Sequence, residues 1–179
     1  MTSEVWPARY PDLNGKAAVL AGTSSVLVGI ARVFCDNGVM PALVVDDRDS
    51  VEAATAYAEQ LGVTFMGIVA DAAERSTWDR VTQHIEQRLG PIDIAAVVAP
   101  PAVRMLVASA LMPDMAARRR GVVVEVGASV ESMEVPAGLR HRAVSATAGV
   151  RALDIAAAVL LSASDVLDAT QVQIALAAS

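Results

Sequence analysis

The sequence holds a single cysteine, Cys35, so it can form neither an internal disulfide bond nor a cysteine-rich metal site. Aromatic residues make up only 3% of the chain, and no apolar run reaches the roughly 18 residues that a membrane-spanning helix needs. The first twelve residues carry Glu4, Arg9 and Asp12 without an apolar core, unlike a secretory signal. We therefore expect a cytoplasmic protein that does not contact a membrane.

Basic residues are also scarce. The formal net charge is −6 and the isoelectric point is near 4.8. The one basic run, Arg118-Arg119-Arg120, falls where a helix should end, a place that favours cations. These observations argue against nucleic acid as a partner. Hydrophobic residues nevertheless reach 54%, a high share for a small monomer, so part of the apolar surface is expected to face another subunit.

What the sequence does contain is a regular alternation of short apolar runs and helical patterns. Strands are expected at 17–20, 42–45, 63–69, 92–98, 122–126 and 172–176. Helices are expected from the first turn to about Asn37, and over 51–61, 74–89, 103–117 and 143–161, with Ser50 capping the second. Because the strands are continuous apolar runs that alternate with helices, the pattern predicts one α/β domain over 1–179, a doubly wound parallel sheet of Rossmann-like type.

The first strand and helix meet at Gly22-Thr23-Ser24-Ser25, a small-residue turn typical of a dinucleotide-binding βαβ unit. Val26 and Val28 stand where the second and third glycines of such a turn are expected. A β-branched side chain there would take the space of the phosphate oxygens. Gly29 could serve as a late glycine if the turn adopts another register.

Three further segments carry a resemblance to a known family. Leu13-Asn14-Gly15-Lys16 precedes the first strand, Gly90-Pro91-Ile92-Asp93 opens the fourth, and Val144-Ser145-Ala146-Thr147-Ala148 begins the last long helical pattern. In this order they resemble the motifs of short-chain dehydrogenase/reductases over nearly the whole chain. The resemblance places Val144 at the family's catalytic tyrosine and Ala148 at its lysine. Val97 and Val98 fall where the family has two asparagines after the fourth strand.

Segments are also missing relative to the family: the stretch over 100–121 is short, and the helical pattern that ends at 161 runs into 162–165 with no sixth strand and no substrate loop after it. The resemblance therefore implies a truncated Rossmann-like domain that lacks the sixth strand and the substrate loop. The departures from the family's motifs also imply no catalytic residue, no cofactor and no bound metal, since valine and alanine carry no titratable or hydrogen-bonding group. The chain is accordingly expected not to be an enzyme. It would be a non-catalytic subunit, a pseudoenzyme, in a hetero-oligomer with an active short-chain dehydrogenase paralogue.

That paralogue would oxidise a hydroxyacyl-CoA or a similar alcohol, and the resemblance extends to the inactive subunit known from benzylsuccinate (toluene) degradation. A heterotetramer is the expected assembly. The last long helix is apolar nearly all round and so must be buried on more than one side. Five residues of this region are expected to form the subunit interface: Val144, Ala148, Ala152, Ile155 and Val159.

Two alternatives remain open at this point. Asp46 and Asp71 follow the second and third strands, where they could hold the adenosine half of a nucleotide in a regulatory module without dehydrogenase activity. They could equally be turn residues. A different chemistry could use Ser129, Ser132 or His141, although no nucleophile, base and orienting group form a recognisable set. The other histidine, His84, fits a structural role within an amphipathic helix.

Overall fold

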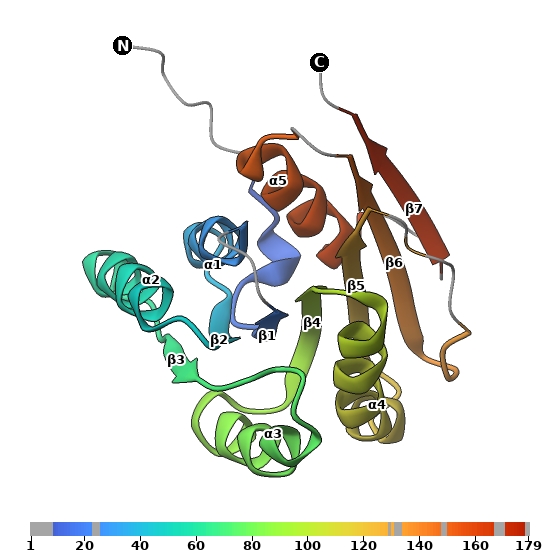
Figure 1. Ribbon diagram of the computed structural model, residues 1–179, viewed down its shortest axis with the longest axis horizontal. Coiled ribbons are helices and arrows are strands. Elements are labelled where there is room, and N and C mark those ends of the chain that lie inside the picture. The colour runs from blue at the N-terminus through green and yellow to red at the C-terminus, as the bar shows by residue number, and fades with distance from the viewer. Residues whose placement is uncertain are drawn as a thin grey trace.

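The computed structural model describes residues 9–22, 26–128, 130, 134–147, 150–166 and 171–177. Within these ranges the chain forms one parallel sheet with helices on both faces (Figure 1). The strands are β1 (Ala17–Gly22), β2 (Met40–Val45), β3 (Met66–Val69), β4 (Ile92–Val98), β5 (Gly121–Gly127), β6 (Leu139–Ala146) and β7 (Gln171–Leu176). The helices are η1 (Pro11–Leu13), α1 (Val26–Asp36), α2 (Arg48–Leu61), α3 (Arg75–Leu89), α4 (Pro101–Ala117) and α5 (Ala152–Ala163).

The strand order is β3-β2-β1-β4-β5-β6-β7, with every pair parallel. The central strands are buried on both faces, as a sheet covered by helices on both sides requires. One core lies between the sheet and α1 and α5, and the other lies between the sheet and α3 and α4. The predicted doubly wound α/β fold is confirmed.

The prediction that the sixth strand is missing is wrong. Residues 139–146 form β6, which pairs with β5 on one side and β7 on the other. The helix expected over 143–161 begins only at Ala152. The apolar-run criterion overlooks β6 because the strand carries Arg140, His141 and Arg142. Two of these side chains have acidic partners: Arg140 pairs with Asp165, and His141 contacts Glu125.

The connection from β5 to β6 runs through residues 128–138, and none of its described residues is helical. Every earlier pair of consecutive strands is joined by a helix, from α1 to α4. The resemblance places a catalytic helix after β5, starting at Val144. Because Val144 instead lies inside β6, that alignment does not hold.

No helix in the described ranges is long and apolar enough to span a membrane.

Candidate functional site

Parallel strands bring all their carboxyl ends to one edge of the sheet, and ligands of such folds bind there, where the strand order reverses. In this chain the reversal lies between β1 and β4. Gly22 ends β1 opposite Val98 of β4. Its φ is +146°, and a Cβ at this position would lie 2.0 Å from the Val98 carbonyl oxygen. Only glycine allows this approach, so the edge keeps the first glycine of the dinucleotide turn.

The start of α1 follows directly. Val26 and Val28 are half-buried and pack against the core beneath α1. One turn into the helix, a Cβ on Gly29 would meet no heavy atom within 4 Å, so the space in front of this glycine is open. The filling of the phosphate space by the two valines stays a prediction, because the turn over 23–25 that precedes them lies outside the described residues. Ser24 and Ser25 lie outside the described residues.

Two acidic residues stand at the neighbouring strand ends. Asp46 directly follows β2 and is exposed, and Asp71 lies just beyond β3. The amide of Ala70 donates to the Val45 carbonyl at 2.8 Å, which holds these two strand ends together. The Oδ1 of Asp71 accepts from the Ala73 amide at 2.8 Å, a turn-forming bond. The structure thus brings Asp46 and Asp71 to adjacent places on the carboxyl edge.

The N-cap of α2 is Asp47, and the prediction of Ser50 is wrong. Asp47 accepts from the backbone amides of Asp49 and Ser50, at 3.2 and 3.0 Å, and from the Ser50 hydroxyl. These bonds, led by the Ser50 hydroxyl, hold the pKa of Asp47 below its usual range. Asp47 is therefore committed to capping, whereas Asp46, the residue directly after β2, is exposed at the edge.

A buried arginine, which is not among the predicted site residues, completes the edge between β4 and β5. Arg104, in the first turn of α4, is only 6% exposed. Its Nη1 donates to the Ala99 carbonyl at 3.1 Å, and a Cβ at Gly127 would lie 2.3 Å from the same atom. The signal that could have found it is that it is the only charged residue between Pro101 and Pro113. Val97 and Val98, which precede this site, are buried and half-buried.

The candidates for a different chemistry are not brought together. His141 is 1% exposed, and its Nε2 lies 3.1 Å from Oε2 of Glu125 on β5, inside the sheet. His141 therefore lies in a buried strand and is not open to a substrate. His84 is exposed on α3. Ser129 and Ser132 lie outside the described residues, and no group of three potential metal ligands occurs among the residues that the structure describes.

The predicted interface residues lie mostly inside the chain. Val144, Ile155 and Val159 belong to the buried core shared with α1. Ala152 is exposed, and Ala148 is outside the described residues. The helix α5 is apolar all round because α1 covers one side and β5, β6 and β7 cover the other. The subunit interface itself remains a prediction.

Compared by sequence, the chain matches no family model and no curated protein. Compared by structure, it is similar to many solved chains. A short-chain dehydrogenase/reductase from Mycobacterium marinum has 14% identity and a TM-score of 0.77, over 94% of this chain and 96% of that one. A citronellol catabolism dehydrogenase from Pseudomonas aeruginosa has 15% identity and a TM-score of 0.78, over 96% and 97%. A metagenomic short-chain oxidoreductase in complex with NADP has 16% identity and a TM-score of 0.76, over 94% and 99%.

At these identities the likeness establishes the fold, which is that of the short-chain dehydrogenase/reductases. The comparisons contradict the prediction that the chain is not an enzyme, because its structural neighbours are dehydrogenases and oxidoreductases. One of these neighbours was solved in complex with NADP and another with NADH. The prediction rested on reading Val144 and Ala148 as positions of a catalytic helix. The structure places Val144 in β6, so the reading has no structural basis.

Proposed function

We propose that the chain is an oxidoreductase-type protein whose carboxyl edge binds the adenosine half of a nicotinamide dinucleotide. The observation that carries the proposal is the placement of exposed Asp46 at the end of β2, next to the strand that ends in Gly22. In dinucleotide-binding folds, an acid at the end of the strand next to the glycine turn accepts hydrogen bonds from the ribose hydroxyls of the adenosine. Asp71, on the neighbouring strand end, lies where the adenine ring would come.

The charge of Asp46 also sets the expected preference between cofactors. A carboxylate that accepts from both ribose hydroxyls repels a phosphate on the same ribose. We therefore propose NAD or NADH as the ligand in preference to the phosphorylated forms. The open space in front of Gly29 supports the approach of the pyrophosphate to the start of α1.

The test is calorimetry of the purified chain with NAD, ADP-ribose and NADP. NAD and ADP-ribose should bind with similar affinity, and Asp46→Asn should weaken both by about tenfold or more, the cost of losing charged hydrogen bonds. Asp49→Asn, three residues further on and also exposed, is the matched control and should bind normally. Absence of heat at millimolar ligand, or equal binding by the Asp46 variant, would refute the adenosine site.

A second proposal concerns assembly with a short-chain dehydrogenase paralogue, in a heterotetramer that oxidises a hydroxyacyl-CoA or a similar alcohol. The observation that supports it is the outer face of α4. Met105 is 67% exposed there, and Ala102, Ser109 and Pro113 are also exposed. The only charge from Pro101 to Pro113 is the buried Arg104. An uncharged helix face of this length is unusual on a solvated surface and suits a protein partner.

Native mass spectrometry of the tagged protein purified from its own host tests this assembly. A defined complex with a full-length dehydrogenase is the expected result. Met105→Glu should dissociate the complex while leaving the melting temperature unchanged, because the side chain is exposed. Arg80→Glu on the exposed face of α3 is the control. A stable monomer at high concentration would exclude the assembly.

A further inference from the structure

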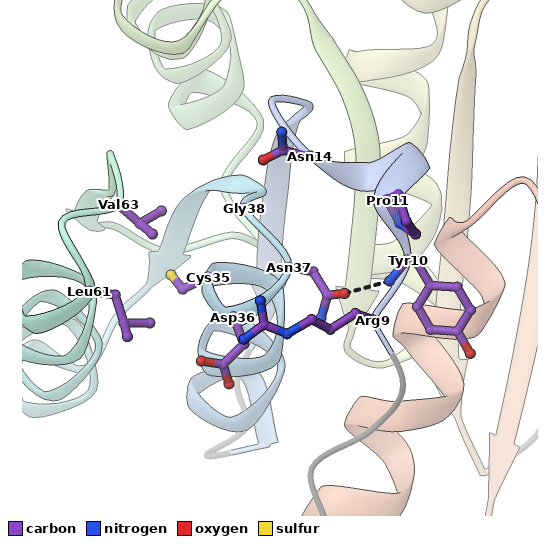
Figure 2. A pocket seen from close by; sticks show the side chains of 10 residues that line it. All are labelled: Arg9, Tyr10, Pro11, Asn14, Cys35, Asp36, Asn37, Gly38, Leu61 and Val63. Atoms are coloured by element: carbon purple, nitrogen blue, oxygen red, sulfur yellow. Dashed lines mark hydrogen bonds between the residues drawn. The ribbon is translucent and has the colours of Figure 1, made fainter.

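A groove of about 530 Å³ opens on the side of the sheet opposite the dinucleotide edge. It lies at the amino ends of β1 and β2, beside the turn that closes α1 (Figure 2). Its volume falls in the range of small-molecule sites. Arg9 and Pro11 form one wall, and Cys35 and Asp36 line the end of α1. Leu61, the last residue of α2, and Val63 form an apolar wall.

The base of this groove is held by internal hydrogen bonds. Asn37 is 8% exposed, and its Nδ2 donates to the Val33 carbonyl at 2.9 Å. Its Oδ1 accepts from the Tyr10 amide at 2.8 Å, the bond drawn in Figure 2. Gly38, at φ +72°, turns the chain back into β2, and its amide donates a hydrogen bond to the Cys35 carbonyl at 3.0 Å. The groove is therefore preformed and does not depend on a ligand for its shape.

Asp36, which lines this groove, has a carboxylate oxygen without a hydrogen-bond donor among the described residues. Its Oδ1 accepts from the Tyr57 hydroxyl at 2.9 Å. Its Oδ2 is inaccessible to solvent and has no hydrogen-bond partner within the described part of the chain. Asp36 is also the last residue of α1, where the helix dipole adds further negative charge next to its carboxylate. A buried acceptor without a donor is costly, and a cation here would relieve both the desolvation and the dipole.

The neighbouring titratable groups leave Asp36 as the anion of the groove. Burial, with the Asp36 charge, raises the pKa of the Cys35 thiol to about 12, so this thiol stays neutral. Burial and the hydrogen bond to Asp36 raise the pKa of Tyr57 to about 12, so its hydroxyl stays a donor. The Arg32 guanidinium lies over the Tyr57 ring, 5.2 Å from its centroid. Arg9 is exposed and reaches across the groove in Figure 2, so it supplies a cation from the other wall.

We propose that this groove binds a small α-amino acid with an aliphatic side chain. Its ammonium group donates to Asp36, its carboxylate pairs with Arg9, and its side chain lies along Leu61 and Val63. Because Oδ2 has no access to solvent, the ammonium group reaches it only when the Asp36 carboxylate turns about its terminal torsion, which is broad, and this turn also moves Oδ1 relative to the Tyr57 hydroxyl. One anion, one cation and an apolar wall in the same groove fit a zwitterion better than they fit an amine or an acid alone.

Three ligands of matched shape test the proposal on the unmodified chain: leucine, 3-methylbutylamine, which lacks the carboxylate, and 4-methylpentanoate, which lacks the amine. Calorimetry and amide NMR shifts at Gly38 are the measurements. Leucine should bind and shift Gly38, and each truncated ligand should bind about tenfold more weakly or less. No binding of leucine at millimolar concentration, or equal binding of all three ligands, would overturn the proposal.

Variants then assign the two charges. Asp36→Asn keeps an acceptor for Tyr57 and should abolish the preference for leucine over 4-methylpentanoate. Arg9→Ala should abolish the preference for leucine over 3-methylbutylamine. Asp79→Asn, exposed on α3, is the control and should bind like the unmodified chain. Leucine binding that is unchanged in both groove variants would show that the ligand lies elsewhere and would overturn the proposal.

Discussion

The Nε2 of His141 on β6 lies 3.1 Å from the Oε2 of Glu125 on β5, and both side chains are almost fully buried. The two residues are diagonal neighbours on one face of the sheet, since His141 is level with Val123 and Glu125 is level with Ala143. A strand that carries three basic residues is thus built into the sheet with the help of an acid on the strand beside it. The pair explains how so polar a sequence becomes an interior strand of the sheet.

Breaking this pair from one side should be costly. Glu125→Leu or His141→Leu alone leaves a buried polar partner behind, and we expect each to lower the free energy of unfolding by about 3 kcal/mol. The double variant should recover most of the loss, because two apolar side chains can pack against each other. Urea unfolding of the four proteins measures the coupling. Additive losses in the double variant would show that the two side chains do not interact.

Two glycines near the dinucleotide edge should respond oppositely to alanine. At Gly22 a Cβ would lie 2.0 Å from the Val98 carbonyl oxygen at φ +146°, and we expect a loss of at least about 2 kcal/mol. At Gly29, inside α1, nothing lies within 4 Å, and alanine should gain up to about 1 kcal/mol from helix propensity. Thermal unfolding of both variants measures the contrast. Equal effects would argue against this geometry of the turn.

The thiol of Cys35 should be inert in the folded protein. It is 3% exposed, and burial and the neighbouring Asp36 raise its pKa to about 12. A thiol reagent such as Ellman's should react at pH 8 only after unfolding. Because the folded pKa is raised, the unfolded chain loses its proton first, so stability should fall as the pH rises from about 8.5 towards 12. Cys35→Ala should flatten that part of the pH profile.

Asp165 connects both ends of the described chain. It pairs with Arg140 at 2.5 Å and with Lys16 at 3.3 Å, and its amide donates to Asp12 at 2.7 Å. Partial burial works to raise the pKa of Asp165, but the charges of Arg140 and Lys16 outweigh it and lower the pKa. The resulting stability is present above the unfolded pKa of about 3.9 and is lost as the pH falls through the lower folded value.

Asp165→Asn should therefore lower the free energy of unfolding at neutral pH by less than about 1 kcal/mol, because the side chain is more than half exposed. The difference from the unmodified chain should shrink in acid and in high salt. Chemical unfolding at several pH values checks this. A difference that is constant with pH would mean that the pairing is not electrostatic.

The sequence predicts those parts of the fold that follow from apolar periodicity alone. The fourth strand is predicted at 92–98, the range in which β4 is observed, and the third main helix is predicted at 74–89 and found at Arg75–Leu89. β6 is missed because its burial depends on partners far along the chain, Glu125 and Asp165. The apolar character of α5 leads to the prediction of a subunit interface, because the local sequence pattern does not show that α5 packs against α1. Arg104 is missed for the same reason.

The packing of α5 against α1 has a consequence for the order in which the protein is made. The apolar face of α1, with Leu27, Ile30 and Phe34, is part of the core that α5 completes. On the ribosome the residues of α1 emerge long before residues 152–163 are translated. The nascent chain therefore carries an uncovered hydrophobic helix through most of its synthesis, and during that interval it is a ready substrate for chaperones and a point where aggregation can begin.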